Sequence, residues 1–200
     1  MLISKTSEGK IKHIGLSSVS SNTLRRAVKI APVVAVQSDY SPFMLDVEGP
    51  AGTDLLHTCR ELGVALVAAM PLGRGMLTST FTSGEPLEDI RSQALPRFME
   101  GNRGQNVKIV SRFKEIADKK GCTMPQLALA FLLKQGEDIV PIPGTKRIKY
   151  LEENWGSLDV HLADEEEAEI RKLVEGSEIS GGVLPPQFGN HYFRDTAEEA

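Results

Sequence analysis

Residues 64–70 read VALVAAM, the most continuously apolar segment of this 200-residue chain. A short apolar run of this kind is typical of a parallel strand, because such a strand is covered on both faces. On both sides of this segment, predicted strands alternate with predicted helices. Further strands are predicted over 11–17, 33–39 and 138–142, and helices over 22–31, 53–63, 107–119, 124–134, 148–155 and from 164 onward. Strands that alternate with helices predict an α/β protein with a parallel sheet.

Two segments fall outside this alternation. Residues 73–105 are rich in Gly, Ser and Thr, and a connection of this length is usually functional or mobile. The segment from residue 180 contains GG, PP and a final TAEEA, which predicts an extended and partly disordered tail. Four βα units are compatible with a small open sheet or with half of a barrel, and the pattern alone does not choose between them.

Composition excludes several classes of protein. The chain has 23 basic and 27 acidic residues and a net charge of −4, so it offers no basic field for nucleic acid or an anionic membrane. Its longest clean apolar run, 64–71, is too short to span a bilayer, and the first residues lack a signal core. Cys59, Cys122 and the four histidines match no metal spacing. These features predict a cytoplasmic protein without a metal site.

Four short motifs carry a resemblance to a known family. They are GKIKHIGLSS at 9–18, VQSDYSPF at 36–43, PLGRGMLT at 71–78 and IVPIPGTKRIKYLEENW at 139–155. In this order they resemble strands five to eight of the aldo-keto reductases, NADP(H)-dependent (β/α)₈ barrel enzymes that reduce carbonyls to alcohols. The PLGRG and IPGT motifs are most similar to the pyridoxal-reductase-like and fungal branch. The resemblance covers about residues 9 to 175.

The resemblance implies an α/β fold that is the carboxy-terminal half of a (β/α)₈ TIM barrel, strands five to eight with their helices. A partial oxidoreductase domain is expected over 1–178 and an extended tail over 179–200. In the family the catalytic Asp, Tyr, Lys and His belong to the first four strands, so no catalytic residue is assigned here. A whole barrel needs about 250 residues. A chain of 200 residues with only four βα units is too short for one, which agrees with a partial barrel. The isolated chain is therefore expected to be inactive.

The resemblance also implies cofactor contacts for NADP(H). Ser17, Ser18 and Gln37 would bind the nicotinamide carboxamide, and Leu72, Gly73 and Arg74 would cross the pyrophosphate. The remaining contacts fall in the fourth motif: Gly144, Thr145, Lys146 and Arg147 would hold the adenosine phosphate, and Glu153 and Asn154 would contact adenine. One departure concerns Ala69 and Met70, which stand where many relatives have a tyrosine that stacks on nicotinamide.

Each of these residues also has a structural interpretation. Ser17 suits a turn, and Lys146 with Arg147 suits a solvated surface. Asp39 and Tyr40 are the best candidates if the chain has chemistry of its own, because they follow a predicted strand. Cys59 is expected in the core, Cys122 on the surface, and Trp155 as a packing anchor.

Three functions remain open. The first is NADPH-dependent reduction of a small-molecule carbonyl by the complete enzyme. The second is a non-catalytic half-barrel that binds a dinucleotide or a partner protein, and the third is a truncated gene product. Because a half-barrel exposes two strand edges, a dimer or association with the missing half-barrel is expected.

Overall fold

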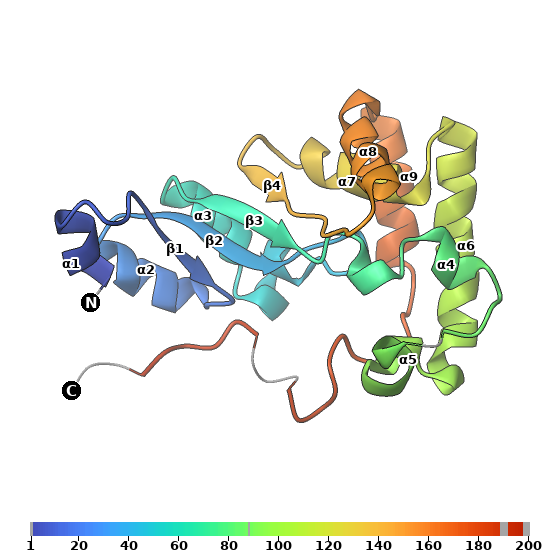
Figure 1. Cartoon of the computed structure of the whole chain (residues 1–200), viewed down its shortest axis with the longest axis horizontal. Helices are drawn as coiled ribbons and strands as arrows, with labels where there is room; N and C mark the ends of the chain where they lie inside the picture. The colour runs from blue at the N-terminus through green and yellow to red at the C-terminus, as the bar shows by residue number, and fades with distance from the viewer. Residues whose placement is uncertain (1, 88, 189–191, 198–200) are drawn as a thin grey trace.

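The computed structural model describes residues 2–87, 89–188 and 192–197 of the chain (Figure 1). Four strands, β1 (Ile14–Ser17), β2 (Val33–Asp39), β3 (Ala65–Ala69) and β4 (Ile139–Pro141), form one sheet in the order β1-β2-β3-β4. Every neighbouring pair in this sheet is parallel. The predicted parallel α/β architecture is therefore confirmed.

Helices fill the connections between the strands. They are α1 (Leu2–Ser7), α2 (Ser21–Ile30), α3 (Leu55–Glu61), α4 (Ser79–Thr82), α5 (Ile90–Ala94), α6 (Glu100–Lys120), α7 (Met124–Lys134), α8 (Ile148–Trp155) and α9 (Asp164–Glu175). Figure 1 shows α6, α8 and α9 grouped at one end of the molecule, with α1 and α2 at the other. The sheet lies between these groups, and its strands lead toward the larger group.

The sheet is buried on one face only. On that face Val36, Leu66 and Ile139 are at most 3% exposed and belong to one core with the helices. On the other face Gln37 of β2 and Val140 of β4 are exposed, Val140 to 47%. Within the described residues β1 and β4 are the sheet edges. The structure therefore contains an open four-stranded sheet that is covered on one face only.

Local signals predicted several boundaries well. Helices α7 and α8 begin and end where the sequence predicts, and Ser20 caps α2 by accepting a hydrogen bond of 3.0 Å from the Thr23 amide. Thr123 forms the expected N-cap of α7. At α9 the cap differs from the prediction of an Asp164–Glu167 pair. There Glu166 accepts a hydrogen bond of 2.9 Å from the amide of Ala163, because the cap lies one residue earlier.

Other boundaries were predicted wrongly. The first strand starts at Ile14 rather than at residue 11, which leaves His13 exposed before the strand. The connection 73–105 contains α4, α5 and the first turn of α6. Helix α6 includes Gly101 and Gly104, two residues that disfavour a helix locally. The buried Phe98 and Asn106 pack beside this part of α6, so tertiary contacts outweigh the local preference.

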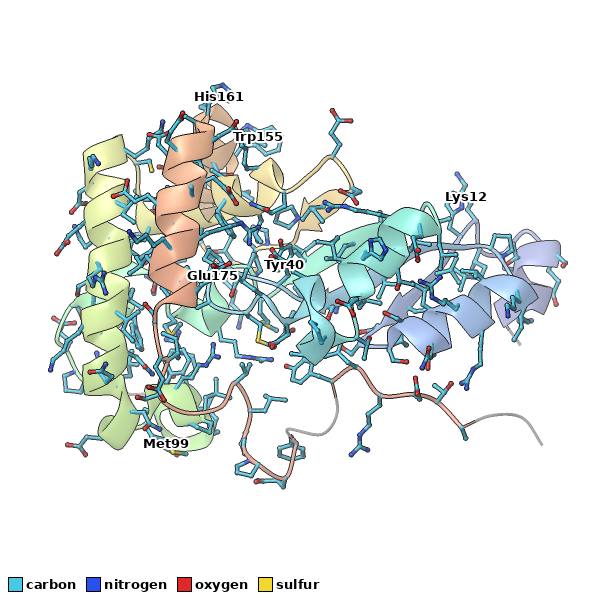
Figure 2. All side chains as sticks on the ribbon, turned by 180° about the vertical axis from the view of Figure 1, so that it is seen from behind. Lys12, Tyr40, Met99, Trp155, His161 and Glu175 are labelled. Atoms are coloured by element: carbon cyan, nitrogen blue, oxygen red, sulfur yellow. The ribbon has the colours of Figure 1, made fainter. Side chains whose placement is uncertain are left out.

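A partly buried polar network ties α9 to the loop after β2. Arg171 of α9 forms an ion pair of 2.7 Å with Glu48, and its guanidinium lies 5.3 Å from the centre of the Phe131 ring. Tyr40 follows β2 and donates its hydroxyl proton to the same Glu48. Tyr40 is completely buried near the middle of the molecule (Figure 2), and this burial raises the pKa of its phenol. The negative charge of Glu48 in this network is therefore balanced by Arg171.

We expect Arg171→Met to lower the free energy of unfolding by about 1–3 kcal/mol, between the values for exposed and buried ion pairs. The reason is that Glu48, only 22% exposed, would lose its cation. Urea denaturation followed by circular dichroism measures the change. Lys134→Met is the matched control, because its partner Asp164 is 90% exposed and should cost almost nothing. Equal stability of the two variants would contradict this account of the core.

Residues beyond α9 form no helix or strand in the part of the tail that the structure describes. The tail returns along the molecule, and Arg194 makes an isolated parallel bridge with Val19 after β1. The predicted disorder falls partly on 189–191 and 198–200, which lie outside the described residues. None of the described helices has the length and apolar character that a membrane crossing requires.

Candidate functional site

A cavity of about 760 Å³ opens at the carboxyl ends of the strands. Its walls come from the ends of β2 and β3, the loops after β3 and β4, and helices α6, α7 and α8. A volume of this size is typical of small-molecule and cofactor sites. The parallel pairing explains the position, because all four strands deliver their following loops to the same edge.

The cavity gathers seven of the twelve residues predicted to contact a cofactor. These are Gln37, Leu72, Arg74, Gly144, Thr145, Glu153 and Asn154. The other five, Ser17, Ser18, Gly73, Lys146 and Arg147, lie outside the set of lining residues. Ser18 still borders this region, because its amide donates a hydrogen bond of 2.8 Å to the Gln37 carbonyl. Lys146 and Arg147 are exposed, as their interpretation as surface charges requires.

The loop after β3 shapes one wall of the cavity. Met70, Gly73, Arg74 and Gly75 all have positive φ angles, between 51° and 96°. For Arg74 this left-handed conformation costs about 1–2 kcal/mol, so the fold must hold it there. At Gly75 an added Cβ atom would overlap Nη1 of Arg91. Glycine thus lets Arg91 approach and donate a hydrogen bond of 3.0 Å to the carbonyl of Arg74.

Arg74 takes part in a closed set of hydrogen bonds. Its Nη2 atom donates to Asp39 Oδ2 and to the Tyr192 hydroxyl, both at 2.9 Å, and Tyr192 donates to the same Asp39 oxygen at 2.7 Å. Burial and the neighbouring Asp39 carboxylate raise the pKa of Tyr192 to about 12. The Nε atom of Arg74 is buried and has no hydrogen-bond partner among the described residues. The Nη2 end of the guanidinium is therefore held by two partners, whereas its Nε donor has none among the described residues.

The opposite wall is built from α6, the start of α7 and α8. Lys114 and Asp118 form an ion pair of 2.5 Å there, and Met124 and Pro125 add apolar surface. Cys122 also lines the cavity. It is half-buried rather than on the surface as predicted, and this burial raises the pKa of its thiol.

Tyr150 of α8 completes this wall. Its ring has the cations of Arg147 and Lys149 at 5.8 Å and 4.8 Å from its centre. Arg147 is thus tied to the outer side of this wall although it does not line the cavity.

The other chemical candidates are distributed differently from the predictions. Tyr40 points into the core toward Glu48, so it does not reach the cavity, whereas Asp39 stays at the strand end beside Arg74. Cys59 is fully buried as predicted. Trp155 is 73% exposed on the periphery (Figure 2), so its prediction as a packing anchor is wrong. Within the described ranges no three His, Cys, Asp or Glu side chains gather in a way that could hold a metal.

Sequence reasoning missed two contributions to this region. Lys114, Cys122 and Met124 come from α6, the start of α7 and the turn between them, which are far in sequence from every strand end. The cap at Thr123 predicts where α7 starts, but nothing local predicts that this helix start faces the cavity. Tyr192 comes from a tail that was predicted to be extended. Only the folded path of the chain brings it to Asp39.

The family model that matches this chain and two proteins similar to it point to one family. The family model described as "Aldo/keto reductase family" matches residues 1–175. The chain is 46% identical over 190 residues to the aldo-keto reductase yakc of Schizosaccharomyces pombe, whose name specifies NADP(+), with 94% of this chain and 55% of that protein covered. It is 47% identical over 176 residues to the aldo-keto reductase str7 of Strobilurus tenacellus, covering 87% and 52%. The chain thus spans about half the length of these curated relatives.

A solved structure agrees on the fold. The glycerol dehydrogenase AKR11B4 from Gluconobacter oxydans superposes with a TM-score of 0.77 at 22% identity, over 88% of this chain and 52% of that one. Such a likeness concerns the arrangement of the βα units and not the reaction.

The prediction of a carboxy-terminal half, strands five to eight, is contradicted. The family match starts at residue 1 of this chain, and the barrel neighbours are matched from its amino terminus. Strands β1 to β4 are therefore counted as an amino-terminal half of the sheet. The physical reason for the error is the repetition in the fold. Every βα unit of such a barrel has the same topology, so short motifs at strand ends do not determine where the count begins.

The parallel half-barrel, the cavity at its strand ends and the match over residues 1–175 lead to one conclusion: this chain belongs to the aldo/keto reductase family.

Proposed function

We propose that this chain binds NADP(H) at the cavity and serves NADPH-dependent reduction of an aldehyde or ketone to an alcohol. The observation that carries the proposal is a cavity at the strand ends that holds Gln37, Arg74, Thr145 and Asn154 together. Support for the cofactor comes from the relative in Schizosaccharomyces pombe, whose name specifies NADP(+). The dinucleotide, when bound, would supply the hydride.

The residues present fit such a cofactor. Gln37 offers both a donor and an acceptor, which a carboxamide needs, and the cationic guanidinium of Arg74 suits a phosphate oxygen. Tyr150, Met124 and Pro125 would give the adenine an apolar wall beside the polar Asn154. Ala69 and Met70 line the cavity at the end of β3 where many relatives have a Tyr-Ser pair with a stacking ring, so the nicotinamide end would be held less firmly.

Proton delivery is the second part of the proposal. A carbonyl reduction needs a general acid whose pKa lies near the working pH. Tyr40 is buried against Glu48, and the pKa of Tyr192 is raised to about 12, so neither is suited to that role. We therefore propose that this chain provides the binding wall, and that a group other than Tyr40 and Tyr192 provides the acid in a complete enzyme. A dinucleotide-binding module without catalysis is the alternative that the same observation favours.

The proposal also covers the organisation of the protein. We assign residues 1–178 to the partial oxidoreductase domain and 179–200 to the tail. The two free cysteines, Cys59 and Cys122, support a reducing, cytoplasmic location.

Cofactor preference provides the first test. We expect NADPH to bind more tightly than NADH by about 1 kcal/mol, or about fivefold, because Lys146 and Arg147 are exposed and only partly desolvated. Isothermal titration calorimetry at low salt measures both affinities. The double variant Lys146→Ala with Arg147→Ala should remove the preference and leave NADH binding unchanged.

The matched control changes two exposed lysines elsewhere, Lys29→Ala with Lys108→Ala, and removes the same charge. If this control removes the preference equally, the effect is general electrostatics and the assignment of Lys146 and Arg147 is wrong. Equal affinities for both cofactors in the wild-type chain would contradict that assignment as well.

Turnover provides a second test. We expect the chain alone to reduce aldehydes and ketones with NADPH at least about 100-fold more slowly than the ~1 s⁻¹ of an ordinary enzyme, since a positioned acid contributes about 10²–10⁴-fold. Absorbance of NADPH over a panel of carbonyls measures the rate, with a full-length family member as the positive control. Ordinary turnover would refute the missing acid and direct attention to Asp39 and Tyr192.

Assembly provides a third test. We propose that a second copy or a complementary half-barrel covers the open sheet face, where Val140 is 47% exposed. Size-exclusion chromatography with light scattering should then show a dimer, a complex or aggregation as concentration rises. A compact monomer at high concentration would count against this part of the proposal.

A further inference from the structure

The tail after α9 is fastened at two places near the cavity. Residues 192–197, here called the tail clasp, meet the start of α2 and the loop after β3. Figure 1 shows the tail leaving the end of α9, passing α5 and running back below the sheet toward α2. The clasp therefore connects two segments that are well separated in sequence.

The first fastening is at the start of α2. The amide of Ser20 donates a hydrogen bond of 3.3 Å to the Arg194 carbonyl, and the amide of Thr196 donates one of 2.9 Å to Thr23 Oγ1. Arg26 donates to the Thr196 carbonyl at 2.8 Å. These bonds use backbone groups of the clasp, so they fix its path whichever side chains it carries.

The second fastening is Tyr192 itself. Its hydroxyl accepts from Arg74 and donates to Asp39, and the side chains of Arg74 and Asp39 are only 22% and 11% exposed. A guanidinium has five N–H donors in a rigid plane, so holding one edge also sets the direction of the others. The held atom is Nη2, and the buried Nε is the donor without a partner among the described residues.

We propose that Tyr192 is a positioning residue: the tail clasp, through the Tyr192–Asp39 pair, orients the Arg74 side chain, which lines the cavity, so that its guanidinium meets an anionic oxygen of a ligand there. The inference rests on the proposed function, because it names the pyrophosphate of a dinucleotide as that anion. It explains why Arg74 keeps a left-handed backbone that glycine would adopt at less cost. A glycine there would have no side chain to position.

The positioning role of Tyr192 is distinct from a purely structural role in packing the tail. Asp39 and Tyr192 both contact Nη2 of Arg74; the carboxylate neutralises the guanidinium in part, and the tyrosine hydroxyl adds no charge. Tyr192 can therefore change the geometry of Arg74 while the charge at the site stays the same. Removing only its hydroxyl separates these two effects.

The test compares Tyr192→Phe with Arg194→Lys, a control that alters an exposed side chain of the clasp and keeps its charge and backbone bonds. Calorimetry of the full chain with NADPH should show about three- to tenfold weaker binding for Tyr192→Phe, the change expected when one net hydrogen bond is lost. Arg194→Lys should stay within about twofold.

A double-mutant cycle separates positioning from a general structural effect. Because Tyr192 acts through Arg74, Tyr192→Phe should weaken NADPH binding no further in an Arg74→Gln background. An equal loss in both backgrounds would overturn the inference, and so would unchanged affinity of the single variant.

Hydrogen exchange of the unliganded chain gives a readout independent of the proposed function. Tyr192→Phe should speed amide exchange in residues 73–77, because the loop loses the contact that holds Arg74. If the wild-type chain fails to bind NADPH, the proposed function is wrong, and this exchange result alone decides whether the clasp holds the loop. Unchanged exchange in residues 73–77 would then refute the clasp.

Discussion

The parallel pairing of four short strands is the constraint on which the site depends. Ser17 is paired with Gln37, Gln37 with Val67, and Val67 with Val140, so these four positions lie level across the sheet. The residues that follow them leave the sheet at the same edge. Without this register, Gln37, Arg74 and Thr145 would not share a cavity. The chemistry of the site therefore rests on backbone hydrogen bonds between strands rather than on any one side chain.

Strain at the loop after β3 follows from the same geometry. The chain must turn sharply at Met70 to leave β3 and cross the sheet edge, and left-handed conformations make that turn over a few residues. Gly75 makes room for Arg91, whose hydrogen bond to the Arg74 carbonyl supports the strained residue from outside. Asp39 and Tyr192 support its side chain from inside. The conformation of Arg74 is therefore determined by contacts from three separate parts of the chain.

The sequence predicted what is local and missed what is assembled over a distance. Helix α7 was located correctly because Thr123 and Pro125 specify its start and its residues are good helix formers. The beginning of α6 was missed because Gly101 and Gly104 weaken the local signal that packing restores. Gln37 and Thr145 were predicted for the site because their motifs resemble those of a known family, and both line the cavity. Lys114 and Tyr192 were not, since their approach to the strand ends depends on tertiary structure.

The cations around the cavity differ in how far they are exposed to solvent, and this difference affects how strongly each can interact with a ligand. The interaction between two charges strengthens as the effective dielectric falls, so a sheltered cation contributes more than an exposed one of the same charge. Arg74 is sheltered and held by three partners, whereas Lys146 and Arg147 are exposed to screening by salt. Affinity for any dinucleotide would then depend mainly on Arg74, and discrimination between phosphorylated and unphosphorylated riboses on the outer pair. Only the inner cation is held by the strands, the loop and the tail, so substitution of Lys146 or Arg147 would leave the contacts of Arg74 in place.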